Sequence, residues 1–559
     1  MTPDYAQFSD IERWNFVQGA IPDWAMALPC TYLNFSVLCT LLIGVAQGTP
    51  LIRSPTPHAR SQQIQWSPCE SNGTLATECA AFPVPLDYTN EASVATLNLE
   101  LVRIRAPNSP SKGSVFLNFG GPGDNGKLSL ATYGPMLQAQ VSLAFDLRLS
   151  QSNPFLHRGT GNTILFSCYA TDEERAAAST LYPELAGNAS DVALGHNNVS
   201  SGVFADTCYV AQNETGQFMT SAFAARDYMR VIDALGEDGL LRYWGLSYGT
   251  VLGATIAAMF PDRIGRVVLD GVANPHEYQL NRDLQMLVDT DKVLTGFCEE
   301  CVATPDKCPL ARNRTAAEIE EAVYELIDHV KFNPLLIPVA GIPTLLEYTT
   351  LKTQIFSVLY SPTGWDDFSA FLDNLITGKL EEAGEYFTKI TSGPPSLDAE
   401  AQFGIKCSDS YRTDNSEEDV LSLIKQRHEL SRIGGDVSDF VLTRCAEWKI
   451  KPKERYTGDF QATTKNPLLI IGNTADPVTP LAAARNVSAG FANSVVLEHG
   501  GYGHASLGQA SLCTAKATRA YFMDGTLPEL GTKCEIDTTP FSGDNGWKKV
   551  LKELAADSK

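Results

Sequence analysis

The sequence predicts an α/β fold with a mostly parallel central sheet and a large helical insertion. Three observations carry this prediction. Between residues 97 and 275, short apolar runs typical of buried strands alternate with helical patterns. Residues 276–462 contain helical patterns without a strand-rich pattern, and apolar strands resume at 467–471 and 494–498. A chain of 559 residues is too long for one core, so a main domain with an insertion is expected.

The stretch Leu240–Asn274 indicates which α/β fold this is. An apolar run leads into Gly245-Leu246-Ser247-Tyr248-Gly249, a small-residue helical pattern reaches Phe260, and a second apolar run follows at Val267–Val272. This order places a G-x-S-x-G sequence on a sharp strand-to-helix turn, the nucleophile elbow of an α/β-hydrolase. Gly245 and Gly249 let the strand and the helix pass without a Cβ clash, which makes Ser247 the predicted nucleophile.

An oxyanion hole is expected beside this serine. The elbow exposes the hydroxyl at a helix N-terminus, where backbone N–H groups and the helix dipole favour a developing negative charge. The glycine-rich turn Gly120-Gly121-Pro122-Gly123 follows the strand expected at Gly113–Asn118. Such a turn supplies one N–H, predicted at Gly121, and the residue after the nucleophile, Tyr248, supplies the other.

The acid and the base are expected after two later strands. Asp476 comes just after the predicted strand Pro467–Ile471, where this fold places the acid. Asp270 is the rival acid, although its position also suits a carboxylate that satisfies turn backbone. The order Ser…Asp…His requires a histidine after Asp476, and two are present. His499 lies at a strand end and suits a structural role, whereas His504 lies in a glycine-rich loop and is the predicted base.

These motifs together resemble the tripeptidyl-aminopeptidase-like branch of the proline iminopeptidase group of serine peptidases. G-G-P-G, G-L-S-Y-G-T, V-V-L-D-G-V-x-N-P, D-P-V-T-P and G-Y-G-H occur in the family's order between Cys69 and Phe541. The resemblance implies an α/β-hydrolase core, a helical cap and a C-terminal portion that carries the acid and the base. It implies removal of residues or short peptides from free N-termini, although some relatives act on esters or amides. A serine triad needs no metal and no organic cofactor.

One stretch departs from the family pattern. Where the family has a strand ending in an Asp-Pro-Arg-Gly turn, residues Leu147–His157 differ, and we expect the strand and its Asp-Pro to be replaced. The stretch is either a misassigned splice boundary or a remodelled loop. It leaves open a third class of function, a non-catalytic binding relative, beside the exopeptidase and a small-molecule esterase or amidase.

We expect the first part of the core at residues 67–275, a helical cap at 276–462 and the C-terminal part of the core at 463–559. The cap would narrow the cleft so that only a chain end enters. Its helical candidates are Asn281–Phe297, Ala316–Phe332, Leu351–Leu359, Trp365–Thr377, Ala399–Cys407 and Glu417–Leu430. An aminopeptidase binds a free α-ammonium with carboxylates, and the cap supplies many candidates: Glu299, Glu300, Asp366, Asp367, Glu381, Glu382 and Glu385.

The N-terminus is predicted to be a targeting segment. Residues 1–48 contain the apolar run Phe35–Ala46 and a signal-peptidase-like Ala46-Gln47-Gly48, and residues 49–66 form a Pro/Ser/Gln-rich linker. Because the acidic start is unusual for a signal peptide, Met26 is an alternative first residue. An uncleaved signal anchor is the rival interpretation, disfavoured because the apolar run is shorter than the ~20 residues that span a bilayer.

Cysteines and sequons point to a eukaryotic secretory route and an extracellular location. Eleven of the 13 cysteines follow the targeting segment. Local pairs are expected at Cys69/Cys79, Cys168/Cys208, Cys407/Cys445 and Cys513/Cys534, and the cluster Cys298, Cys301, Cys308 supplies one bridge and one spare thiol, with zinc as the disfavoured alternative. Predicted glycosylation sites are Asn72, Asn188, Asn198, Asn213, Asn313 and Asn486. The net charge of −22 argues against nucleic acid or an anionic membrane as partner.

Overall fold

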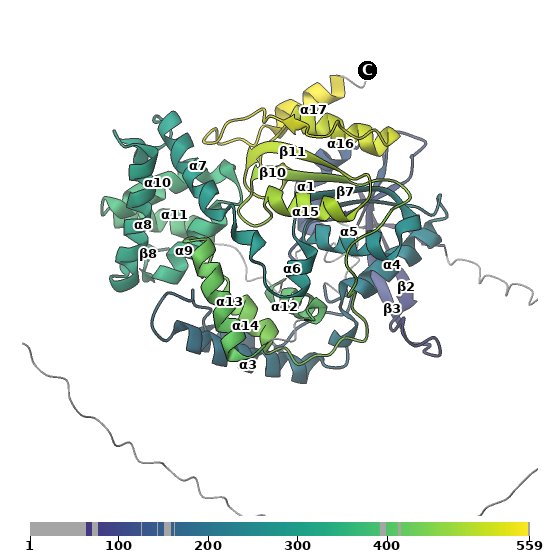
Figure 1. Cartoon of the computed structure of the whole chain (residues 1–559), viewed down its shortest axis with the longest axis horizontal. Helices are drawn as coiled ribbons and strands as arrows, with labels where there is room; N and C mark the ends of the chain where they lie inside the picture. Colours follow the sequence, from purple (N-terminus) through teal and green to yellow (C-terminus); the bar gives the residue numbers. More distant parts are fainter. Residues whose placement is uncertain are drawn as a thin grey trace, which may run out of the picture. The chain divides into compact units, whose positions relative to one another are not determined.

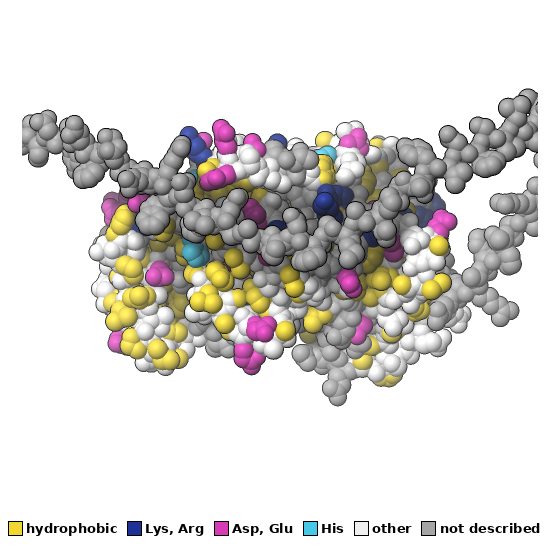
Figure 2. Space-filling model, turned by 90° about the horizontal axis from the view of Figure 1, so that it is seen from below, with side chains coloured by type: hydrophobic (Ala, Val, Ile, Leu, Met, Phe, Trp, Pro, Cys, Tyr) yellow, Lys and Arg dark blue, Asp and Glu magenta, His cyan; other side chains and the backbone are white. Residues whose placement is uncertain are grey.

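A computed structural model describes residues 63–69, 76–123, 126–141, 144–149, 158–160, 163–391, 398–411 and 415–556. The predicted targeting segment and most of the predicted linker lie outside these residues. Within them, no helix is both long and apolar enough to cross a membrane. Figure 2 shows one face of the molecule, on which acidic side chains are scattered rather than gathered in one patch.

The described residues contain one large sheet in the order β1-β2-β3-β5-β4-β6-β7-β10-β11-β12. Its strands are β1 (Ser67–Cys69), β2 (Thr77–Pro85), β3 (Thr96–Ile104), β4 (Ser114–Asn118), β5 (Asp146–Leu149), β6 (Leu241–Ser247), β7 (Ile264–Val272), β10 (Leu469–Ala475), β11 (Val495–Tyr502) and β12 (Lys533–Cys534). The pairs β1–β2, β2–β3 and β3–β5 are antiparallel, and every neighbouring pair from β5 to β12 is parallel. The predicted mostly parallel sheet is therefore confirmed.

Helices cover both faces of this sheet (Figure 1). Adjacent residues of a strand point to opposite faces, and in β6 Tyr243 packs into one core cluster while Trp244 packs into another. The first face carries α4 (Ser221–Leu235), α5 (Tyr248–Met259) and α15 (Leu481–Gly490). The second carries α1 (Gly126–Gln140), α16 (Leu512–Asp524) and α17 (Trp547–Ala556). Burial on both faces explains why β7 reads as a nearly continuous apolar run.

A helical region lies beside the sheet (Figure 1), and its residues between 293 and 387 form most of a separate hydrophobic core. Its helices are α6 (Pro275–Gln279), α7 (Thr290–Ala303), α8 (Ala316–Phe332), α9 (Tyr348–Val358), α10 (Trp365–Ile376), α11 (Leu380–Thr391), α12 (Asp398–Asp409), α13 (Glu417–Leu430) and α14 (Asp439–Ala446). The helices α2 (Asp172–Leu181) and α3 (Ala193–Gln212) precede the elbow in the chain, and α3 packs on α14. The helical region thus draws on two separate parts of the chain.

Two expectations about strands need correction. Residues Asp146–Leu149 do form a strand, β5, which pairs with both β3 and β4, so the strand expected to be replaced is present. Residues 150–157 lie outside the described part. The helical insertion also contains a hairpin, β8 (Leu335–Val339) with β9 (Ile342–Leu346). Its turn residues Ala340 and Gly341 both have positive φ, a hairpin geometry that is usually signalled by Asn-Gly rather than Ala-Gly.

Candidate active site

Ser247 occupies a strained turn between β6 and α5. Its φ of 56° and ψ of −126° are sparsely populated by residues other than glycine. A Cβ at Gly245 would lie 2.3 Å from the carbonyl oxygen of Gly249, and a Cβ at Gly249 would lie 2.6 Å from the carbonyl oxygen of Asn118. The two glycines therefore allow the close crossing of strand and helix that holds the serine in this conformation.

The glycine-rich loop after β4 lies directly against this serine. A Cβ at Gly120 would lie 2.6 Å from the Ser247 Cβ, and the Gly120 N–H donates to the Asn118 Oδ1 at 3.1 Å. Gly120 and Gly123 have φ of 111° and 105°, conformations that favour glycine. Gly121 and Tyr248, the predicted oxyanion-hole donors, line the same cavity as Ser247.

Asp476 and His504 meet at the carboxyl end of the parallel sheet. The His504 Nδ1 lies 3.1 Å from the Asp476 Oδ2 and 3.2 Å from the Oδ1. The fully buried carboxylate also accepts the Thr479 hydroxyl at 2.6 Å and the N–H groups of Val478, Thr479 and Ala505 at 2.8–2.9 Å. Burial opposes the charged form of Asp476, but His504 and these donors outweigh it and lower the pKa. A carboxylate at Nδ1 leaves the Nε2 of His504 for proton transfer.

Asp270 lies in the same region but does not contact the imidazole ring. Its Oδ1 accepts the Ser506 N–H at 2.9 Å, and its Oδ2 accepts the Ser506 hydroxyl at 2.6 Å and the Trp244 Nε1–H at 3.4 Å. Complete burial raises its pKa to about 6. Asp270 therefore anchors the loop that follows His504.

His499 has a structural environment. Its ring is completely buried, and its Nδ1 lies 3.0 Å from the Thr514 hydroxyl. Burial lowers its pKa to about 4, so the ring is neutral at ordinary pH. Thr514 belongs to α16, on the opposite face of the sheet from α5.

Two further residues hold the histidine loop, and sequence reasoning missed both. The Asn473 amide donates to the carbonyl oxygens of Gly503 and Ala505, each at 2.8 Å. The Tyr360 carbonyl accepts the His504 N–H at 2.8 Å, and the two rings meet edge to face with centroids 5.1 Å apart. Asn473 lies in β10, three residues before Asp476. A polar residue near the end of an apolar strand was visible in the sequence and could have been named as a candidate. Tyr360 comes from the helical region, and only the tertiary fold brings it here.

A cavity of about 600 Å³ opens at Ser247 between the sheet and the helical region. It is bounded by the oxyanion loop, by α6 and by residues of α9, α12, α13 and α14. Three carboxylates line it: Glu184, Glu277 and Asp283. None of the seven acidic candidates in the cap is among the residues that line the described part of this cavity.

Comparison with known proteins identifies two segments of the chain. Residues 195–306 match the α/β-hydrolase fold, and residues 431–534 match TAP-like proteins. The chain is an α/β-hydrolase with a TAP-like segment. The predicted family resemblance and fold class are thereby confirmed.

Three relatives span most of this hydrolase. Serine protease Hip1 of Mycobacterium tuberculosis is 26% identical over 493 residues, covering 85% of this chain and 91% of that protein. A tripeptidyl aminopeptidase of Streptomyces lividans is 24% identical and covers 85% of this chain and 87% of its own length. Carboxylesterase B of Mycobacterium tuberculosis is 23% identical, with 88% and 94% covered. The α/β-hydrolase is therefore a serine hydrolase, and its relatives include both peptidases and an esterase.

The predicted disulfides of the hydrolase are present. The bonds are Cys69–Cys79, Cys168–Cys208, Cys301–Cys308, Cys407–Cys445 and Cys513–Cys534. Cys298 is the spare thiol of its cluster and is buried. Because Cys301 and Cys308 are bonded to each other, their sulfurs are not available to the competing zinc site.

The remaining predicted residues fall on the surface or outside the described part. The asparagines of five sequons are exposed: Asn188, Asn198, Asn213, Asn313 and Asn486. Asn72 lies outside the described residues. Arg158, which directly follows the stretch that departs from the family pattern, is instead completely buried and pairs with Asp227, Nε to Oδ2, at 2.9 Å. Its guanidinium also donates to the carbonyl oxygen of Pro85, so Arg158 ties α4 to the end of β2.

Proposed function

We propose that this α/β-hydrolase is an exopeptidase that releases residues or short peptides from free N-termini, with Ser247, Asp476 and His504 as its triad. The observation that carries the proposal is the cavity at Ser247. Its far walls come from the helical region, and it contains one carboxylate without an ion-pair partner in the described chain, Glu277. A peptide N-terminus brings the matching positive charge.

The geometry supports a two-step acyl transfer. The His504 Nε2 takes the hydroxyl proton of Ser247 while the serine oxygen attacks the scissile carbonyl carbon. The N–H groups of Gly121 and Tyr248 would stabilise the resulting oxyanion. His504 then gives the proton to the leaving amine, the C–N bond breaks, and an ester on Ser247 remains. Water, deprotonated by His504, hydrolyses this ester and restores the serine.

The charges of the cavity favour Glu277 as the group that binds the substrate amine. Glu184 pairs with Arg444 at 2.6 Å, and Asp283 pairs with Lys406 at 2.6 Å. Glu277 accepts the Gln285 N–H at 2.9 Å. Val272 stands opposite Ser247 in the sheet register, and Glu277 follows it by five residues. A half-buried carboxylate so placed suits the α-ammonium of a short peptide bound to Ser247.

One assay tests the activity. Peptidyl nitroanilides with free and with acetylated N-termini are compared with nitrophenyl esters of the same acyl groups. An exopeptidase loses most of its kcat/KM when the amine is acetylated. Equal rates with free and acetylated substrates, together with fast ester hydrolysis, would instead establish the esterase that the relative Carboxylesterase B suggests.

We also propose that the enzyme follows the eukaryotic secretory route. Five disulfides and five exposed sequon asparagines in the described residues support an oxidising, glycosylating compartment. N-terminal sequencing of the protein from culture medium, before and after N-glycan removal, tests this. A mature terminus near residue 49 is expected, whereas an intact first segment in a membrane fraction would indicate an anchor.

A further inference from the structure

A second cavity lies next to the one at Ser247. It has a volume of about 830 Å³ and is bounded by α2, α3, α12 and α14. Aromatic rings of Tyr182, Phe204 and Phe403 line it. Glu184 lines both cavities, so this side chain stands where the two adjoin.

The length of α9 gives the approximate distance between Glu184 and the proposed triad. Tyr360, just beyond the C-terminal end of α9, touches His504, while Thr349 in its first turn accepts the N–H of Ala186, two residues after Glu184. Both Thr349 and Tyr360 line the first cavity. Nine helical steps of 1.5 Å lead from Thr349 to Val358, the last residue of α9, so these two walls lie about 14 Å apart. Glu184 therefore marks the end of the first cavity that is distant from the triad.

An ion pair holds Glu184 in this position. Its Oε1 lies 2.6 Å from the Arg444 Nη1, and the Arg444 guanidinium lies 4.4 Å and 4.5 Å from the ring centres of Phe204 and Phe403. The Arg444 side chain is 10% exposed and the Glu184 side chain is 43% exposed, so water is excluded from the guanidinium but still reaches the carboxylate. Stacking and charge together fix the guanidinium between the cavities.

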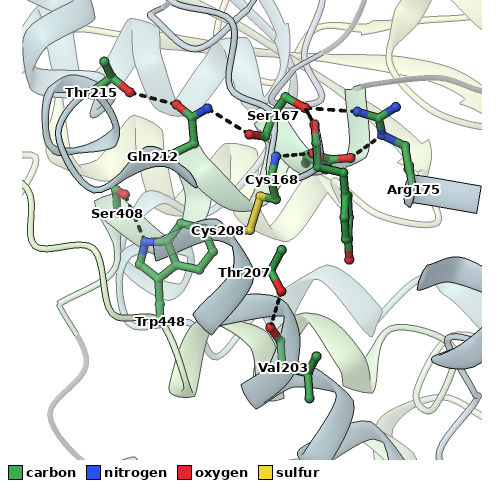
Figure 3. The surroundings of a disulfide bond; sticks show 12 residues. Ser167, Cys168, Arg175, Val203, Thr207, Cys208, Gln212, Thr215, Ser408 and Trp448 are labelled. Atoms are coloured by element: carbon green, nitrogen blue, oxygen red, sulfur yellow. Dashed lines mark hydrogen bonds and ion pairs between the residues drawn. A yellow bond between two sulfur atoms is a disulfide. The ribbon is translucent and has the colours of Figure 1, made fainter. Parts of the chain in front are cut away.

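The far wall of the second cavity is braced independently. Arg175 donates to the Ser167 hydroxyl at 3.0 Å beside the Cys168–Cys208 disulfide (Figure 3). Arg175 also pairs with Glu400 of α12, whose carboxylate accepts the Cys168 N–H. None of these contacts involves Glu184 or Arg444. A substitution that breaks the Glu184–Arg444 pair should therefore leave this wall in place.

We propose that the Glu184–Arg444 pair is a partition that limits how many residues a substrate can have before the scissile bond. This inference rests on the proposed exopeptidase function. An extended chain covers about 3.4 Å per residue, so about 14 Å accommodates about four residues. Short segments place their amine at Glu277 and do not reach the partition. Without the partition the two cavities form one groove, and a longer N-terminal segment reaches the aromatic rings beyond it.

The test is a length series of alanine-rich peptidyl nitroanilides with free N-termini, from two to eight residues. Wild type is expected to lose at least 10-fold in kcat/KM beyond about four residues. Glu184→Ala should regain at least 10-fold on the longest substrates while the shortest ones and nitrophenyl acetate remain unchanged. Glu184→Gln keeps the volume and a hydrogen bond to Arg444, so its length limit should stay near that of wild type. Asp206→Ala, which breaks the exposed Lys449–Asp206 pair outside both cavities, is the matched control.

Three results would overturn the partition. A Glu184→Ala profile that equals wild type shows that the pair limits nothing. A loss on every free-amine substrate, short ones included, shows that Glu184 binds the substrate amine instead. If wild type cleaves esters but no peptide of any length, the exopeptidase function itself fails, and the length limit fails with it.

Discussion

Asp270 holds the loop of the proposed base rather than the base itself: its carboxylate binds both the backbone N–H and the hydroxyl of Ser506, two residues after His504. Asp476 instead contacts the His504 ring, with its Oδ2 3.1 Å from the Nδ1. Asp270 lies near the C-terminal end of β7 and Asp476 directly follows the neighbouring strand β10, so both stand at the carboxyl end of the parallel strands, yet they differ in what they touch. This difference separates a loop anchor from a triad acid.

Asp476→Asn should lower kcat by several orders of magnitude, because an amide favours the wrong tautomer of His504 and cannot stabilise its charged form. Asp270→Asn should cost stability of about 1–2 kcal/mol and reduce kcat far less, since it loosens the loop only. The two variants are compared by steady-state kinetics and thermal unfolding. An active Asp476→Asn beside an inactive Asp270→Asn of unchanged melting temperature would reverse the assignment.

The burial of Asp270 predicts a pH-dependent stability. Its pKa is raised to about 6 from an ordinary value of 3.8, so the folded state binds the proton more tightly than the unfolded state. Its contribution to stability is present in full below about pH 4 and is lost as the pH rises through about 6. Relative to Asp270→Asn, wild type should lose up to about 3 kcal/mol of unfolding free energy across this window. Urea unfolding at several pH values measures the difference, and parallel curves for the two proteins would contradict it.

The sequence predicted the helices whose apolar periodicity and side-chain caps are local signals. The expected helices Ala316–Phe332 and Glu417–Leu430 have these same bounds in the structure, and a side-chain cap, Thr315 or Ser416, precedes each. The strand at Asp146–Leu149 was missed because its pattern departs from the family's and it is only four residues long. The hairpin at residues 335–346 was missed because its turn lacks the usual signal.

The residues of the candidate site also fall into those that local sequence predicts and those that only the tertiary fold brings together. Ser247, Asp476 and His504 stand next to strand ends in recognisable motifs, so the sequence could nominate them. The carboxylates of the cavity could not be nominated, because Glu184 and Glu277 lie outside the acid-rich helices and reach the cavity only through tertiary packing. Tyr360 carries no local signal at all.

Ser247→Ala should abolish turnover of every substrate and prevent labelling by a fluorophosphonate probe, because no other side chain can form the acyl-enzyme. The substitution removes one half-buried hydroxyl, so the melting temperature should change little. Gel-based labelling and thermal unfolding test both statements. A variant that still reacts with the probe at the wild-type rate would exclude Ser247 as the nucleophile.

Cys298, the free thiol of its cluster, should resist alkylating reagents in the native protein. It is buried, burial raises its pKa, and Cys301 and Cys308 are bonded to each other. Iodoacetamide should therefore leave Cys298 unmodified in the native protein and label it in urea without reductant. Peptide mapping under non-reducing conditions reads out both states. A mapped bond from Cys298 to either neighbour would contradict the connectivity.

Glu277→Gln should raise KM for free-amine peptides by roughly 10- to 100-fold, because a charged hydrogen bond to the substrate ammonium is worth about 1.5–3 kcal/mol. Glutamine keeps the shape and the contact to the Gln285 N–H, so the fold should persist. Nitrophenyl esters of acyl groups that lack an amine should react as with wild type, since they have no charge to lose. Glu299→Gln is the matched control, because Glu299 does not line the cavity. If Glu277→Gln slows charged and uncharged substrates equally, the carboxylate acts on cavity shape, and the amine must bind elsewhere.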